Sequence, residues 1–94
     1  MPIKIYVDDD QRKEVAWLCD DNWRLADQVD ALWNWLQNEG ATLAAGRYVV
    51  DIGFAPRSDA SGGGAAMSPE FLDRMADLGM SLFLSEYPPI SSSQ

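Results

Sequence analysis

The chain has 94 residues, 47% of them hydrophobic and 23% charged, a composition typical of a single folded domain rather than a disordered chain. Fifteen acidic residues outnumber seven basic ones and give a formal net charge of −8, which disfavours direct binding to nucleic-acid phosphates and suits a basic partner. No window approaches the roughly 20 consecutive apolar residues that a transmembrane helix needs.

The N-terminal segment predicts a β-hairpin. Residues 3–8, "IKIYVD", alternate apolar and polar side chains with the period of two of a half-buried strand. The polar run "DDDQRK" interrupts the pattern, and "EVAWLCD" resumes it with Val15, Trp17 and Cys19 on one face. A polar turn between two such stretches is typical of a hairpin.

An amphipathic helix follows from about Asn22, where the period changes to that of an α-helix. Asp21 or Asn22 is expected to cap its first turn, and Gly40 to end it as a left-handed C-terminal cap. Ala26 and Trp33 lie on one flank of the apolar stripe and Trp35 on the other. The stripe itself consists of Leu25, Val29, Leu32 and Leu36.

The second half of the chain predicts strand, loop, helix and strand. Residues 47–54, "RYVVDIGF", alternate again, and the glycine-rich residues 55–67 predict a surface loop. Ser68 is expected to cap a helix whose first residue is Pro69 and which Gly79 ends. Residues 80–87 read as a last strand, which the following prolines stop.

The order β-β-α-β-α-β predicts an α+β fold, a two-layer sandwich with two helices on one face of a four-stranded mixed sheet. The last two strands, joined by a helix, are expected to be parallel. Met80, Leu82 and Leu84 should face the helices. We expect one domain over residues 1–88 and a flexible tail over 89–94. The opposite face should carry Tyr6, Val49, Phe83 and Tyr87 among Lys4, Asp51 and serines.

The segments "LADQVDALWNWL", "GRYVVDIGF" and "GGGAAMSPEFLDRMADLGMSLFLSEYP" together resemble the C-terminal half of the bacterial domain-of-unknown-function family 4279. The resemblance covers roughly residues 25–88, whereas the N-terminal third lacks the family's proline and tryptophan-lysine-glycine segment. It implies a small bacterial accessory protein and carries over no catalytic residues. The matching positions are Ser68, Glu70, Leu72, Leu78, Gly79 and Tyr87.

Residues with catalytic or metal-binding chemistry are few. The chain has no histidine, and its one cysteine, Cys19, fits a buried structural thiol. The aspartates at residues 8–10 lack the spacing and glycine of a calcium loop. The three glycines at 62–64 precede a helix, but Glu70 in its first turn would oppose a phosphate, so a connector is favoured. We expect no enzyme activity, no cofactor and no metal.

Four tryptophans are unusual in a chain of this length. Trp33 and Trp35 flank opposite edges of one helix stripe, so one edge is a candidate for exposure, although both can also rim the core. Tryptophan is enriched at interface hot spots. The predicted partner-binding residues are therefore Trp35 and Trp23 with the surrounding carboxylates Asp20, Asp21, Asp27 and Asp30.

These features predict a non-catalytic, acidic protein-binding module, of the immunity or inhibitor type, that acts on a basic bacterial or phage target. A nucleic-acid mimic that inhibits a defence complex, similar to an anti-CRISPR protein, is one alternative. A small anion-binding domain that uses the loop from Arg57 to Met67 is another, and a homodimer is compatible with each. A lone cysteine and an apolar N-terminal stretch too short for a signal peptide predict a cytoplasmic protein.

Overall fold

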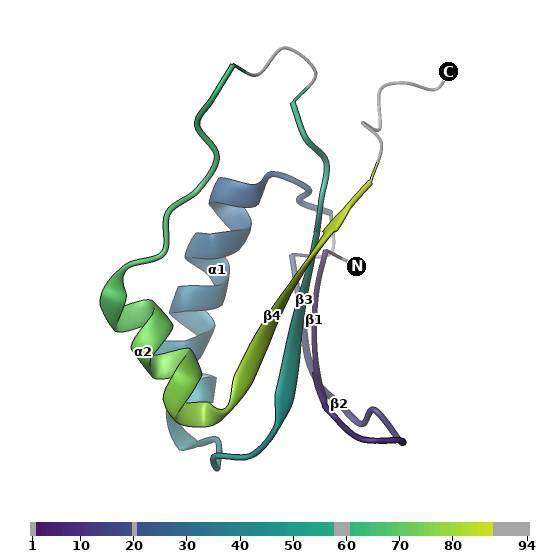
Figure 1. The fold of residues 1–94 in the computed structure, drawn as a ribbon, viewed down its shortest axis with the longest axis vertical. Coiled ribbons are helices and arrows are strands. Elements are labelled where there is room, and N and C mark those ends of the chain that lie inside the picture. The colour runs from purple at the N-terminus through teal and green to yellow at the C-terminus, as the bar shows by residue number, and fades with distance from the viewer. Residues whose placement is uncertain (1, 20, 58–60, 88–94) are drawn as a thin grey trace.

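Two helices cover one face of a four-stranded sheet in the computed structural model, which describes residues 2–19, 21–57 and 61–87 (Figure 1). This arrangement confirms the predicted α+β fold and the order of its strands and α-helices. The elements are β1 (Ile3–Val7), β2 (Glu14–Leu18), α1 (Leu25–Gln37), the 3-10 helix η1 (Glu39–Thr42), β3 (Tyr48–Phe54), α2 (Pro69–Leu78) and β4 (Met80–Glu86).

The sheet is mixed and has the strand order β2-β1-β3-β4. β1 runs antiparallel to both β2 and β3, whereas β3 and β4 are parallel, as expected for two strands joined by a helix. Ile5 lies opposite Val50, and Val50 lies beside Leu82 on the other side. Because directly opposite residues point to the same face, this register places the apolar residues of β1, β3 and β4 toward the helices.

The core lies between the helices and the two central strands. Ile3, Ile5, Val50 and Ile52 are completely buried there, and burial of each such side chain contributes roughly 1.5 to 3 kcal/mol. The helices also contact each other through stacked rings of α1 and α2, with centroids 5.1 Å apart. The other buried apolar residues are Val29, Leu32, Trp35, Leu36, Phe71, Met75 and Leu78.

The start of α1 differs from the prediction. The helix begins at Leu25, and no side chain caps its first turn. Asn22 Oδ1 instead accepts a hydrogen bond from the backbone N–H of Arg24 at 3.0 Å, which closes a turn before the helix. Neither Asp21 nor Asn22 is therefore the helix cap, because the polar segment folds on itself before the helix begins.

The end of α1 also differs from the prediction. The helix ends at Gln37, and Asn38 rather than Gly40 is the C-cap residue. Gly40 is buried in η1, where an added Cβ would come within 3.1 Å of the Trp35 ring. The glycine thus allows the chain to approach an indole closely and does not form a left-handed cap.

A buried glutamine ties α1 to the sheet. Gln28 is 0% exposed. Its Nε2 donates hydrogen bonds to the carbonyl oxygens of Asn22 at 2.8 Å and Gly53 at 2.7 Å. Gln28 thereby joins the segment before α1 to the end of β3, a role that an apolar stripe drawn from the sequence does not include.

The predicted bounds of α2 are confirmed. Ser68 Oγ accepts a hydrogen bond from the backbone N–H of Phe71 at 3.1 Å, and Pro69 is the first helical residue. Gly79 is the C-cap residue and has a φ of 79°, in the left-handed region. β4 begins at the next residue, so the helix and the strand meet without a loop.

Contrary to the predicted alternation, Trp17 does not lie on the same face of β2 as Val15 and Cys19, because Val15 and Cys19 pack against the core. The pairing of β1 with β2 is irregular between Ile5 and Tyr6, which is the signature of a β-bulge. Ala16 lies opposite Ile5 and so faces the core, whereas Trp17 lies opposite Lys4 on the outer face. A simple alternation from Val15 to Cys19 cannot anticipate a bulge.

No helix in the described part of the chain is long and apolar enough to cross a membrane. The predicted tail over residues 89–94 falls outside the described residues.

Candidate functional site

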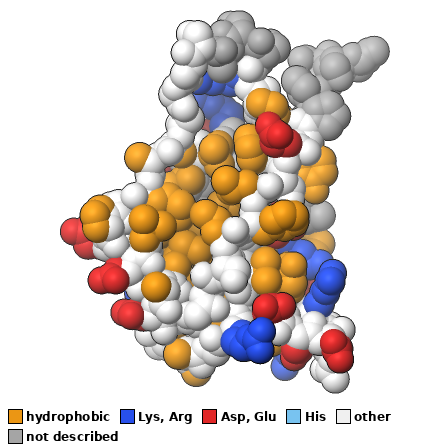
Figure 2. All heavy atoms as spheres, in the orientation of Figure 1, with side chains coloured by type: hydrophobic (Ala, Val, Ile, Leu, Met, Phe, Trp, Pro, Cys, Tyr) orange, Lys and Arg blue, Asp and Glu red, His pale blue; other side chains and the backbone are white. Residues whose placement is uncertain are grey.

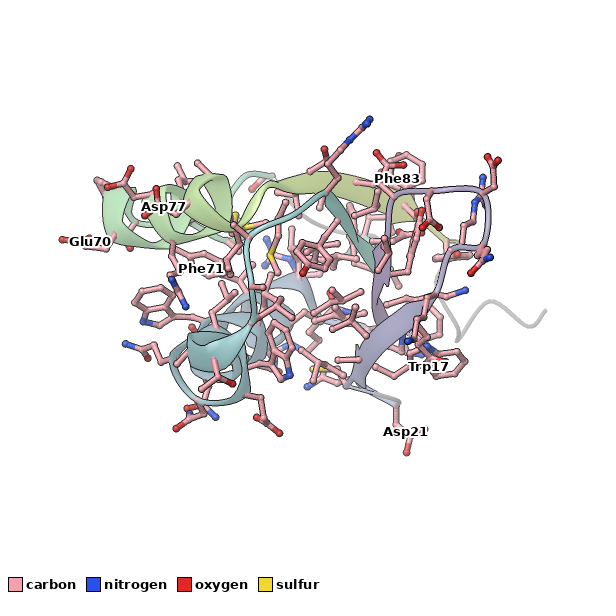
Figure 3. The ribbon with its side chains drawn as sticks, turned by 90° about the horizontal axis from the view of Figure 1, so that it is seen from below. Trp17, Asp21, Glu70, Phe71, Asp77 and Phe83 are labelled. Carbon is pink, nitrogen blue, oxygen red and sulfur yellow. The ribbon has the colours of Figure 1, made fainter. Side chains whose placement is uncertain are left out.

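The face of the sheet opposite the helices is open, and large aromatic side chains lie on it. Figure 3 shows both helices on one side of the sheet and Trp17 and Phe83 on the other, near its two edges. Trp17 on β2 is 43% exposed and Phe83 on β4 is 56% exposed. Tyr87, directly after β4, is 46% exposed. We call the outward side of the four strands with these three residues the open face.

Charged and polar side chains occupy the middle of the open face. Lys4 lies directly opposite Asp51 on the neighbouring strand, and Asp51 Oδ1 accepts a hydrogen bond from Ser85 Oγ at 2.8 Å. The ring of Tyr6 lies below two cations, with Lys4 Nζ at 5.6 Å and the Arg12 guanidinium carbon at 6.0 Å from its centroid. Charged groups at the centre of the open face are therefore flanked by the exposed rings of Trp17 and Phe83 on the two edge strands.

Trp23 lies at one end of the open face. Its ring contacts Tyr87 edge to face, with centroids 5.3 Å apart and planes at 75°. Gly53 makes room for this pair, since a Cβ there would lie 2.6 Å from Tyr87 Cε2. Trp23, one of the two predicted anchors, is half-buried, so part of its surface is open to a partner.

The other predicted anchor, Trp35, is a core residue and the prediction of an exposed ring is corrected. It is 8% exposed and packs against Gly40. Trp33, on the opposite edge of the same helix, stacks on Phe71 of α2 (ring labelled in Figure 3). Both edges of α1 are therefore occupied, one by η1 and the other by α2.

The predicted carboxylates that the structure describes are Asp21, Asp27 and Asp30. Asp27 is 3.6 Å from Arg24 Nη1 and accepts a hydrogen bond from Asn22 Nδ2 at 3.1 Å. Asp30 and Asp21 are exposed, and Figure 3 shows Asp21 pointing away from the rest of the molecule. Asp20 lies outside the described residues.

An acidic stripe on α2 was not singled out from the sequence. Glu70, Asp73 and Asp77 recur at the spacing of one helix face, and all three are exposed. Figure 3 shows Glu70 and Asp77 on the side of α2 that faces away from the sheet. Among the ion pairs of the described residues none involves these three. The signal was present in the sequence, because three acids at this spacing lie opposite the buried Phe71.

The described residues contain no cluster of three or more metal-ligating side chains. Asp9 Oδ1 accepts hydrogen bonds from the backbone N–H groups of Gln11 and Arg12, at 3.0 and 2.9 Å, so this aspartate closes the hairpin turn. Asp8 lies 3.9 Å from Arg47. Cys19 packs against the core as a half-buried residue.

A pocket of about 470 Å³ lies between the start of α1, the end of β3 and the glycines at 62–64. Two arginines line it, and each has an internal contact: Arg24 with Asp27, and Arg57 with the carbonyl oxygen of Gly62 at 2.7 Å. The Asp27 carboxylate in the first helical turn would also repel an anion. Anion binding at the glycine loop, whose residues 58–60 lie outside the described residues, stays a prediction.

No protein-family model matches the chain, and neither does any curated protein or solved structure. The resemblance of residues 25–88 to family 4279 therefore stays a prediction. What the protein does has to be inferred from its surface chemistry.

Proposed function

We propose that the protein is a non-catalytic binding module that docks a basic protein on its open face, in the manner of an immunity or inhibitor protein directed at a bacterial or phage target. The observation that carries this proposal is the exposure of three aromatic side chains on one uncovered sheet face. Trp17, Phe83 and Tyr87 are 43%, 56% and 46% exposed.

Exposed rings of this size on one face favour a protein partner. Each aromatic side chain buries about 150 to 250 Å² when it is covered, and such residues dominate interface energies. Interface cores are enriched in tryptophan, tyrosine and phenylalanine and depleted in charge. Lys4 and Asp51 stand at directly opposite positions near the centre of the face, and their formal charges cancel.

The acidic surplus supports a basic partner. The chain carries a formal charge of −8, while the open face contributes little of it. The stripe of Glu70, Asp73 and Asp77 and the exposed Asp30 lie on the helix layer. A field of this sign accelerates encounter with a cationic surface and is screened by salt beyond about 8 to 10 Å.

The nucleic-acid-mimic alternative needs a continuous row of carboxylates. Most of the described carboxylates fall instead at the hairpin turn, around the start of α1 and along α2, which Figure 1 places in different parts of the molecule. No observation on the described residues favours this alternative over protein binding.

A capture experiment with two matched variants tests the proposal. The immobilised protein is exposed to bacterial lysates at low salt, and the bound proteins are quantified for the wild type, Trp17→Ala and Leu72→Ala. Leu72 is 50% exposed and lies on α2, so it controls for the loss of an exposed apolar side chain on the helix layer. We expect Trp17→Ala to weaken binding of a specific, basic partner at least about tenfold and Leu72→Ala to leave it unchanged.

Equal capture by the wild type and Trp17→Ala would contradict the open face as the binding site. Reversal of charge at Asp27 and Asp30 tests the electrostatic part separately. If the double variant binds the same partner as tightly at low salt as the wild type does, the carboxylates at the start of α1 have no part in recognition.

A further inference from the structure

The edge of the sheet formed by β4 is uncovered and apolar. β4 is the last strand in the order β2-β1-β3-β4, and three consecutive residues are exposed: Leu82 at 38%, Phe83 at 56% and Leu84 at 50%. Figure 2, which views the molecule from this edge, shows hydrophobic side chains gathered between α2 and β4. Leu82 and Leu84 point to the helix side of the sheet, yet α2 leaves both exposed.

The backbone of this edge has hydrogen-bonding groups directed away from the sheet. The N–H of Tyr87 donates to Phe54 O, and Gly79 O accepts from Tyr48 N–H, so residues 79 and 87 face β3. Since alternate residues of a strand turn their main-chain groups to the same side, those of Met80, Leu82, Leu84 and Glu86 turn to the open edge.

The two edges of the sheet differ in how they are protected. β2, at the opposite edge, is five residues long, has a bulge and begins at Glu14 next to Lys13. β4 is seven residues long, and its one charged residue, Glu86, stands at its end. Natural sheets protect a free edge by short strands, bulges and charges. The β2 edge has all three, whereas the β4 edge has almost none, so the β4 edge is available to pair with another strand.

The sequence of β4 fits a second copy of itself. Residues 81–85 read Ser-Leu-Phe-Leu-Ser, the same in both directions, and Phe83 is also the midpoint of the strand Met80–Glu86. Antiparallel pairing about a two-fold axis at Phe83 places serine opposite serine, leucine opposite leucine and phenylalanine opposite phenylalanine. Leu82 and Leu84, whose main-chain groups face the edge, then form the hydrogen-bonded pairs. The two nearest registers that keep the same main-chain groups paired match the side chains less well. One places a leucine opposite Glu86, and the other places Ser81 opposite Phe83.

We propose that the protein forms a symmetric homodimer in which the β4 strands of two copies pair antiparallel about Phe83, making one continuous eight-stranded sheet. The interface is isologous, with both helix layers on the same side and both open faces on the other. This dimer goes beyond the proposed function and does not depend on it, because the edge pairs through backbone groups. Of the rings of the open face, Phe83 lies at the two-fold axis, whereas Trp17 lies at the opposite edge of the sheet.

The expected affinity of the two copies for each other is modest, and the effect of salt distinguishes this dimer from binding of a basic protein. Pairing of two seven-residue strands buries less than the roughly 1,200 Å² of a standard interface, so a dissociation constant of about 1 to 100 µM is expected. Each copy carries a charge of −8, so the copies repel one another and added salt should strengthen the dimer. Salt should weaken binding of a basic protein, and the two proposals can therefore fail separately.

Sedimentation of the full chain from about 5 to 500 µM tests the dimer, with three proteins compared. We expect the wild type to dimerise, Leu84→Lys to dimerise at least about tenfold more weakly because each copy then places a cation opposite Leu82 of the other, and Trp17→Lys to behave as the wild type. Trp17 is similarly exposed but lies at the opposite edge of the sheet. Circular dichroism shows whether each variant is folded. A wild type that is monomeric throughout this range overturns the proposal, as does a dimer that only Trp17→Lys disrupts, which would indicate stacked open faces.

Disulfide trapping in a Cys19→Ala background tests the register independently of the lysine variant. Phe83 alone is opposite itself, so Phe83→Cys should form a covalent dimer on mild oxidation, because non-hydrogen-bonded antiparallel pairs bring Cα atoms to about 4.5 Å, a separation that a disulfide can span. Ser81→Cys, opposite Ser85 of the second copy, should cross-link far less, whereas a mixture of Ser81→Cys and Ser85→Cys should do so efficiently. Cross-linking of Ser81→Cys with itself and not of Phe83→Cys would overturn this pairing.

Discussion

Single residues decide where the layers of this protein can approach each other. Gly79 shows this most clearly, because it joins α2 to β4 with a φ of 79° and lies against the backbone of Gly46. Its carbonyl oxygen accepts a hydrogen bond from the N–H of Tyr48 at 2.9 Å, and the N–H of Gly46 donates to Leu78 O at 3.0 Å. The junction thus holds the start of β3 against the end of α2.

Gly79→Ala is expected to lower the free energy of unfolding by roughly 2 kcal/mol or more. A left-handed conformation costs a non-glycine residue about 1 to 2 kcal/mol, and an added Cβ would overlap the carbonyl oxygen of Gly46. Gly46→Ala is the matched control, since a Cβ there meets the Tyr48 ring at an ordinary 3.4 Å. Urea denaturation measures both variants, and equal stabilities of the two would contradict the proposed contact.

At the scale of helices and strands, local patterns in the sequence predicted which elements form but not always which of their side chains face the core. The ends of α2 followed from Ser68, Pro69 and Gly79, because caps act through residues adjacent in the chain. The facing of Trp17 did not follow, because a bulge in β2 is a property of its pairing with β1. The apolar stripe of α1 was also predicted from the sequence. The burial of Gln28 and Trp35 was not, because it depends on contacts with the end of β3 and with η1.

The candidate site likewise has features that the sequence predicted and features that it could not predict. The outward facing of Tyr6, Val49 and Phe83 was predicted from strand alternation and is confirmed by the register of β1, β3 and β4. The exposure of Leu82 and Leu84 could not be predicted, because it requires knowledge that β4 is an edge strand and that α2 does not cover these side chains. Strand order depends on contacts distant in the sequence.

The cap of α2 makes a measurable contribution at this scale. Ser68→Ala is expected to cost about 1 kcal/mol of stability, because the N–H of Phe71 loses its acceptor at 3.1 Å. Ser68→Gly should cost only a few tenths of a kcal/mol, since glycine is tolerated at an N-cap. Thermal unfolding followed by circular dichroism compares the stabilities of the wild type, Ser68→Gly and Ser68→Ala, which are expected to decrease in that order. An alanine variant as stable as the glycine variant would show that the hydroxyl is not needed.

At the scale of the whole molecule, like charges dominate. The chain has a formal charge of −8, and the ion pairs among the described residues, Arg24 with Asp27 and Arg47 with Asp8, have largely exposed side chains. Exposed pairs contribute little to stability, about 0 to 1 kcal/mol each. The repulsion among carboxylates is therefore the larger long-range effect, and salt screens it.

We therefore expect the melting temperature to rise between low salt and about 0.2 M sodium chloride, by a few degrees, given roughly 4 to 8 °C per kcal/mol for a domain of this size. Asp73→Lys combined with Asp77→Lys changes the formal charge from −8 to −4, because each substitution adds two charges, and should reduce that rise. Calorimetry at several salt concentrations measures both. A wild-type melting temperature that falls with salt would indicate that attractive pairs dominate after all.

The parallel pairing of β3 with β4 has a consequence for synthesis on the ribosome. β3 lies at the centre of the sheet, and its second neighbour is the last of these strands to be translated, more than twenty residues later. Until β4 has emerged from the ribosome, Val50 and Ile52 have no neighbouring strand on that side, and the backbone hydrogen bonds between β3 and β4 cannot form. Chaperones that recognise extended apolar segments would have their binding window in this interval, before α2 and β4 close over the strand.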